Sequence, residues 1–300
     1  MSRVLLPLLL VGSFTLGSFS IALGPSFALG QEIPADSPNA DSPDAEAKAL
    51  TAEFRKQAAH MMTEYDFKLP EHPDVKFELI PEAVLYWTNP VQGQWEGAVF
   101  LWLAEGRPAV IANPLHQTNR RKMAHEFHQL TESPLTGLRN GKIVWRTSES
   151  GVTWKPVPDA EPPAATATAR GAQMRAISRK FSATKTEPNK VVRNLRLLTR
   201  PVWVCKPDAK PGSPASDLID GACFLLAQST DPKVVVLLEA RRTGDKSEWF
   251  YALSRLNQHE YVVSYADREV QRFPFVPFSD RDDPLQPYTK FFNQLYQDLP

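Results

Sequence analysis

The sequence shows no excess of charge of either sign. Its 34 lysines and arginines balance its 34 aspartates and glutamates. Electrostatics therefore gives no reason to expect a nucleic acid or an anionic membrane as a partner. Glycine is also scarce, with 14 glycines against 27 prolines, which indicates many ordered loops and turns.

Common catalytic motifs are missing as well. The sequence has no Gly-x-Ser-x-Gly motif, so it lacks the nucleophile turn of the α/β-hydrolases. It has no glycine-rich phosphate loop and no dinucleotide-binding fingerprint. We therefore predict no cofactor, and the absence of a complete catalytic constellation favours a protein that is not an enzyme.

The single long apolar run lies at the N-terminus and is typical of a signal peptide. Ala28-Leu29-Gly30 offers small residues at the two positions that a signal peptidase recognises, so we predict cleavage before Gln31. The alternative is an uncleaved anchor, because the run is long enough to cross a bilayer, but its prolines, serines and glycines make a poor permanent span. The rest of the sequence has no second apolar run long enough to span a membrane. We therefore expect the protein in the periplasm or outside the cell.

An oxidising compartment would let the only two cysteines form a disulfide. Cys205 and Cys223 lie on consecutive strand-like segments of the second half, where a bridge across a hairpin is one interpretation. The matching positions in the first half, Trp87 and Val99, are apolar, so the architecture does not need a bridge. The alternative is a pair of buried thiols. No cysteine lies near the N-terminal run, which excludes a lipoprotein anchor there.

What the sequence does contain is an internal duplication. Residues 96–113 and 220–237 follow one pattern without a gap. Each begins with a similar hexapeptide, Glu-Gly-Ala-Val-Phe-Leu in the first and Asp-Gly-Ala-Cys-Phe-Leu in the second, and each has a proline at the matching position, Pro108 and Pro232. A helical stripe precedes each copy, and strand-like segments follow it. We predict an α+β fold of two tandem pseudo-repeats, each a helix followed by an antiparallel meander of about five strands.

This interpretation divides the chain into six parts. After Pro287, the spacing of Tyr288, Phe292 and Leu295 predicts a short C-terminal helix. The predicted parts are a signal peptide (1–30), a disordered linker (31–44), a first repeat (45–157), a linker (158–167), a second repeat (168–278) and a C-terminal segment with the short helix (279–300).

The segment His125-Glu126-Phe127-His128 resembles a zinc motif, but its spacing does not fit one. Histidines of a helical metalloprotease site are four residues apart, whereas these are three apart on a predicted strand, whose alternation places them on opposite faces. We expect both to face solvent and predict no metal site. A hydrolase with a site assembled from loop residues of the first repeat is the alternative function, with His116, His125 and Glu126 as candidate catalytic residues.

Two further groups of residues were considered as ligand sites. Asp280, Asp282 and Asp283 form a compact acidic segment, which we interpret as a solvated turn because a calcium site needs more oxygen ligands. Trp87 and Trp95 flank a loop and could line a groove for a carbohydrate or peptide; their alternative is packing in the core. The groove is expected at the junction of the halves, near residues 88–95 and 206–220.

Several segments resemble a family of uncharacterised exported bacterial proteins. They are WTNPVQGQWEGAVFLWLAEGRPAVIAN (87–113), HEFHQL (125–130), GVTWKPVPDAEPP (151–163), QMRAISRKFSA (173–183) and DGACFLLAQSTDPKVVVLLEAR (220–241). The resemblance covers nearly the whole mature chain and implies export and the domain limits. It implies no activity, cofactor or catalytic residue. The leading interpretation is a non-catalytic exported binding or structural module.

Overall fold

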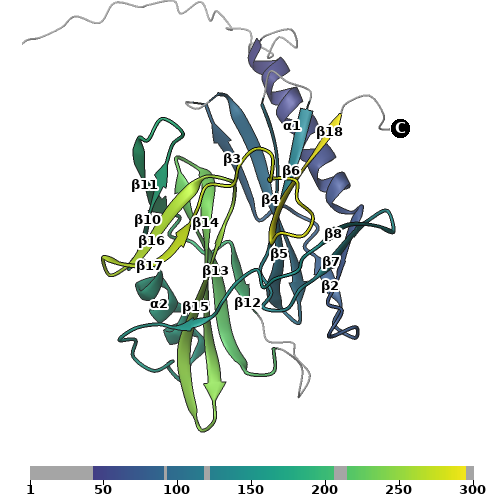
Figure 1. Cartoon of the computed structure of the whole chain (residues 1–300). Coiled ribbons are helices and arrows are strands. Elements are labelled where there is room, and N and C mark those ends of the chain that lie inside the picture. The colour runs from purple at the N-terminus through teal and green to yellow at the C-terminus, as the bar shows by residue number, and fades with distance from the viewer. Residues whose placement is uncertain (1–42, 91–92, 118–121, 206–214, 295–300) are drawn as a thin grey trace, which may run out of the picture.

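The protein is built mostly from antiparallel strands (Figure 1). The computed structural model describes residues 43–90, 93–117, 122–205 and 215–294. Strands make up 51% of the described residues, which contain only two helices. The predicted α+β class, with a helix followed by a meander in each repeat, is therefore wrong. The predicted signal peptide lies outside the described residues.

The first half begins with helix α1 (Pro43–Met62). Its strands are β1 (Tyr65–Lys68), β2 (Phe77–Leu79), β3 (Leu85–Asn89), β4 (Trp95–Ala104), β5 (Arg107–Gln117), β6 (Lys122–Gln129), β7 (Thr136–Arg139) and β8 (Lys142–Arg146). They form two sheets rather than one meander, because β1, β7 and β8 form a separate three-stranded sheet with β7 in the middle.

The second half follows strand β9 (Lys155–Pro156) and begins with helix α2 (Ala167–Ser178). The Thr166 hydroxyl accepts a hydrogen bond from the Ala169 amide and caps this helix. Its strands are β10 (Phe181–Thr186), β11 (Val192–Leu197), β12 (Trp203–Cys205), β13 (Leu218–Gln228), β14 (Asp231–Thr243), β15 (Lys246–Arg255), β16 (Glu260–Tyr265) and β17 (Arg268–Phe273). Strand β18 (Tyr288–Gln294) ends the described chain.

Three apolar clusters hold these elements in layers. One, around Phe100 and Trp102, lies between α1, the β1-β7-β8 sheet and the outer face of β4 to β6. A second, around Phe224 and Val236, lies between α2 and the curved sheet that runs from β17 to β9. The third joins the inner faces of β4 to β6 and β13 to β15, so both central sheets are buried on two faces.

The two halves exchange their last strands. Strand β9, which follows the first half, pairs with β15 of the second half. Strand β18, which follows the second half, pairs with β6 of the first half over seven residue pairs, from Tyr288–His128 to Gln294–Lys122. The chain must therefore cross from one sheet to the other between residues 274 and 287, and this crossing loop lies at the front of Figure 1.

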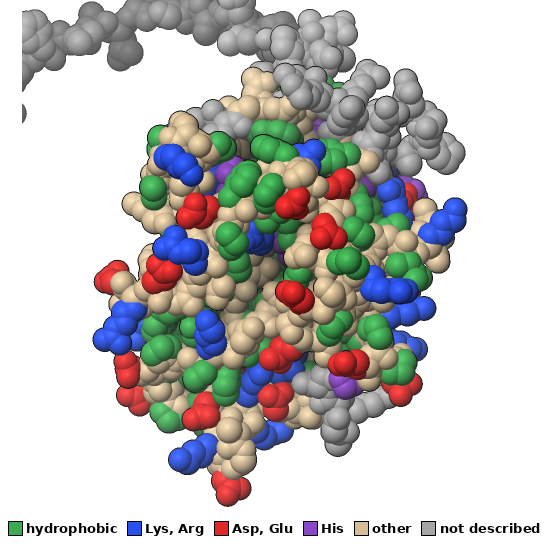
Figure 2. Space-filling model, in the orientation of Figure 1, with side chains coloured by type: hydrophobic (Ala, Val, Ile, Leu, Met, Phe, Trp, Pro, Cys, Tyr) green, Lys and Arg blue, Asp and Glu red, His purple; other side chains and the backbone are tan. Residues whose placement is uncertain are grey.

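The C-terminal helix predicted over Tyr288 and Phe292 is thus wrong, because these residues form strand β18. Its other predicted residue, Leu295, lies outside the described residues. Charged side chains on the visible face are mixed in sign (Figure 2). No helix within the described ranges is long and apolar enough to cross a membrane.

Candidate ligand-binding cleft

The three residues considered for a hydrolase do not meet in one site. His116 and His125 lie on the face of the sheet toward α1 and β1, where the His116 Nε2 atom is 2.6 Å from Glu96 Oε1 and His125 Nδ1 is 2.9 Å from the Tyr65 hydroxyl. Glu126 lies on the opposite face. Each of the three is buried among its own partners, so no shared catalytic centre results.

Strand alternation separates His125 from His128 as expected, but neither faces solvent. The exposed fractions of these side chains are 0% and 1%, because both faces of β6 are covered. Burial, with a smaller contribution from the Arg139 charge, lowers the pKa of His125 to about 3. Each imidazole is therefore neutral at pH 7 and takes the place of a core side chain.

Trp87 lies in the core between the halves and Trp95 at its edge. The Trp87 indole is 3% exposed. Its Nε1 atom donates a hydrogen bond of 2.9 Å to the side-chain oxygen Oδ1 of Asn113. Trp95 is half-buried against the same cluster. Parts of both loops near which a groove was expected, residues 91–92 and 206–214, lie outside the described residues.

The two cysteines are free and buried. On the paired strands β12 and β13, Cys205 lies opposite Gly221 and Cys223 lies opposite Trp203, so the thiols are diagonal neighbours. Burial raises the pKa of the Cys223 thiol to about 12. The structure thus contains the second of the two alternatives, a pair of buried thiols.

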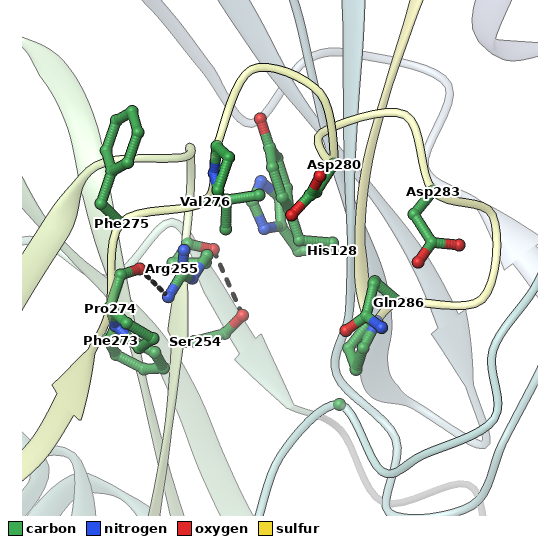
Figure 3. Close-up of a pocket in the computed structure, with 14 residues that line it drawn as sticks. His128, Ser254, Arg255, Phe273, Pro274, Phe275, Val276, Asp280, Asp283 and Gln286 are labelled. Carbon is green, nitrogen blue, oxygen red and sulfur yellow. Dashed lines mark hydrogen bonds between the residues drawn. The ribbon is translucent and has the colours of Figure 1, made fainter.

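A cleft of about 450 Å³ lies under the crossing loop. Its lining combines strand ends from both sheets with the loop that joins them. His128 and Tyr288 come from the first sheet, Ser254 and Arg255 from the second. The remaining lining residues belong mostly to the segment from Phe273 to Pro287 (Figure 3).

Arg255 is the unusual residue of this cleft. Its side chain is 9% exposed, and its Nη2 atom donates a hydrogen bond of 2.7 Å to the backbone carbonyl of Pro274. The guanidinium carbon lies 5.3 Å from the centre of the Phe273 ring. Its Nη1 atom is buried and forms no hydrogen bond, and no carboxylate in the described residues lies within ion-pair distance.

Other buried cations in the described residues have carboxylate partners. Besides Arg255, the buried basic residues are Lys185 and Lys233. Lys185 Nζ lies 3.2 Å from Glu187 Oε1, and Lys233 is paired with Asp231. Buried charges are normally paired, because removal from water costs several kcal/mol per ion. Arg255 is thus a buried cation whose counter-ion the described chain does not supply.

His128 forms the back of the same cleft. Its ring stacks on Tyr288 with the centroids 4.9 Å apart, and neither ring nitrogen has a hydrogen bond of good geometry. Burial and the charges of Arg255 and Lys290 lower its pKa well below the usual range, against a weaker opposing effect of the Leu256 backbone. The neutral imidazole is 1% exposed and backs the cleft through its ring contact with Tyr288.

Behind Tyr288 a buried network holds the first-sheet wall in place. The Glu126 Oε1 atom accepts hydrogen bonds from the Tyr288 hydroxyl at 3.3 Å and Lys290 Nζ at 3.1 Å. Its Oε2 atom accepts from Asn113 Nδ2 at 3.0 Å. Glu126 therefore positions the strand that carries Tyr288 and does not face the cleft, which accounts for its burial without a catalytic role.

Sequence reasoning missed Arg255 and did not connect Asp280 or Asp283 with a cleft. The sequence did contain one signal for Arg255. This arginine lies between the mostly apolar strand segment 249–254 and Leu256, so a charged side chain is flanked by core residues on both sides. No protein-family model, curated protein or solved structure matches the chain.

Proposed function

We propose that the protein is an exported, non-catalytic binding protein that holds a small organic anion in the cleft under the crossing loop. The anionic group would lie against the Arg255 guanidinium and complete its missing ion pair. The observation that carries this proposal is the buried Nη1 atom of Arg255, which has no partner among the described residues.

The walls of the cleft suit an apolar ligand body. Phe273, Val276 and Tyr288 line it together with several prolines. A pocket of mostly apolar lining with a few polar groups that converge on one point is typical of small-molecule sites. Arginine is suited to the task, since its planar guanidinium binds a carboxylate through two parallel hydrogen bonds.

Titration calorimetry with octanoate and 3-phenylpropionate tests the proposal. Both probes combine a carboxylate with an apolar body, and we expect at least one to bind the wild-type protein. Arg255→Gln removes the charge but keeps a polar side chain, and it should weaken binding by about 10- to 100-fold, since a charged hydrogen bond contributes about 1.5–3 kcal/mol.

Arg268→Gln is the matched control. Arg268 is an exposed arginine at the start of β17, five residues from Phe273 at the cleft end of the strand, and its loss changes the net charge equally. It should bind both probes as the wild type does. Binding that survives Arg255→Gln unchanged, or no binding of either carboxylate to the wild type, would refute the proposed site.

A further inference from the structure

We infer that the natural ligand is a zwitterion, whose cationic group is held at the mouth of the cleft by Asp280 and Asp283. This inference rests on the proposed function, because it assigns the second half of the same ligand. Arg255 would bind the anionic end and the two aspartates the cationic end, with the apolar body between them.

The two aspartates line the cleft without a cation of their own. Asp280 is exposed and Asp283 is half-buried, and both belong to the cleft lining. Their hydrogen bonds come from the Ser279 hydroxyl and the Leu285 amide. No ion pair involves either carboxylate within the described chain, and Arg281 between them instead lies over the rings of Phe278 and Phe292.

Arg255 and the aspartates occupy different sides of the cleft. In Figure 3, Arg255 lies beside Phe273 and Pro274, whereas Asp280 and Asp283 come from the loop on the other side. The aspartates therefore do not supply the counter-ion that Arg255 lacks. A ligand in the cleft must therefore pair with the buried Arg255 cation at one end, and its other end must lie beside the two carboxylates.

This arrangement disfavours a simple anion. Like charges in a cleft repel, and the two carboxylates would raise the free energy of a purely anionic ligand as it enters. A ligand with an ammonium group at its outer end converts this repulsion into attraction. Charge complementarity of this kind selects between ligands more than it adds affinity, so it defines the class of ligand.

The crossing loop is built firmly enough to present these carboxylates. Its backbone is attached to both sheets of the first half, by hydrogen bonds from Gln129 N of β6 to Pro287 O at 2.9 Å and from Arg146 N of β8 to Pro284 O at 2.9 Å. The Trp145 indole donates to Gln286 O at 2.8 Å. Asp280 and Asp283 are therefore held in place relative to the floor of the cleft.

A chain-length series of ω-amino acids provides the test. Calorimetry compares 4-aminobutanoate, 6-aminohexanoate and 8-aminooctanoate with butanoate, hexanoate and octanoate. We expect one chain length at which the ω-amino acid binds about tenfold more tightly than the alkanoate of equal length. That length measures the distance between the two ends of the cleft. In the double variant Asp280→Asn/Asp283→Asn, this gain should disappear, while the plain carboxylate binds equally well or better.

Two further arms identify the source of the zwitterion and provide a control. Tri-leucine with both termini free, compared with N-acetyl-tri-leucine, tests whether a short peptide fills the cleft as an amino acid does. Asp267→Asn is the matched control, because Asp267 is exposed in the turn between β16 and β17. It should leave the preference for the amino compounds unchanged.

The outcomes separate this inference from the proposed function. If carboxylates bind through Arg255 but no amino compound, peptide or amino acid, binds more tightly than its counterpart without the ammonium group, the zwitterion is refuted and the anion site stands. If the gain persists in the double variant Asp280→Asn/Asp283→Asn, the assignment of the cationic end to these two aspartates is refuted. If neither carboxylates nor amino acids bind, the proposed function itself fails.

Discussion

Replacement of Arg255 by methionine should stabilise the unliganded protein while abolishing binding. Removal of an uncompensated buried charge relieves a desolvation cost of several kcal/mol. The losses are smaller. The Pro274 carbonyl loses the hydrogen bond from Arg255 Nη2, but Pro274 is an exposed residue, where water can replace that donor. The contact with the Phe273 ring, about 0.5–2 kcal/mol as a cation–π interaction, is partly replaced by the methionine side chain. We therefore expect Arg255→Met to raise the free energy of unfolding by about 1–3 kcal/mol.

Lys233→Met is the informative comparison, because Lys233 is equally buried but paired. Its removal leaves Asp231, which is 5% exposed, without a cation and with Asn89 as its remaining described side-chain donor, 3.2 Å away. The loss of one partner of a buried ion pair costs about 3–5 kcal/mol. The two substitutions should thus change stability in opposite directions.

Urea unfolding followed by tryptophan fluorescence measures both effects. The comparison requires that the wild type and both variants show the same slope of unfolding free energy against urea concentration. A fall of more than about 1 kcal/mol for Arg255→Met, the typical net contribution of one hydrogen bond, would refute the reasoning. It would mean that the protein itself compensates the Arg255 charge, and the argument for an anionic ligand would lose its foundation.

Three other predictions concern the core. Burial lowers the native pKa of His125 to about 3, so below about pH 6.5 this residue binds a proton in the unfolded chain but not in the native chain. The free energy of unfolding should therefore fall as the pH drops from 6.5 toward 3. His125→Gln should reduce the slope of this fall by about 1.4 kcal/mol per pH unit at most. Gly97→Ala should destabilise by about 1–3 kcal/mol in urea unfolding, since the new methyl group would lie 2.3 Å from the Trp87 ring. Cys205 and Cys223 should not react with a thiol reagent at pH 8 in the native protein and should both react in urea, because their pKa values are raised by burial; the absence of reactive thiols in urea would instead indicate a disulfide.

Local patterns predicted individual elements well. Asn140-Gly141 is a dipeptide typical of a type I′ hairpin turn, and between β7 and β8 both residues have positive φ angles, of 49° and 76°. A helix before each copy of the duplicated pattern, as α1 and α2 are, and the separation of His125 from His128 also followed from spacing alone. In each case the deciding interactions lie within a few residues of one another.

The fold class was wrong because its deciding contacts are distant in the sequence. Strand β1 has four residues directly after α1, and it is a strand because Tyr65 to Lys68 pair with Arg139 to Thr136. Strand β18 shows a spacing that is also typical of a helix, but its partner β6 lies about 160 residues earlier. Periodicity reports neither pairing, since it registers which face is apolar and not what covers it.

The cleft was beyond sequence reasoning for the same reason. His128, Arg255 and the crossing loop meet because β18 returns to the first sheet and the chain must span both halves to reach it. The proposed ligand would join these parts again, with its anionic end on the second sheet and its cationic end on a loop attached to the first. Ligand binding should therefore raise the stability of the two halves together, in proportion to RT ln(1 + [L]/Kd), and should not stabilise one half alone.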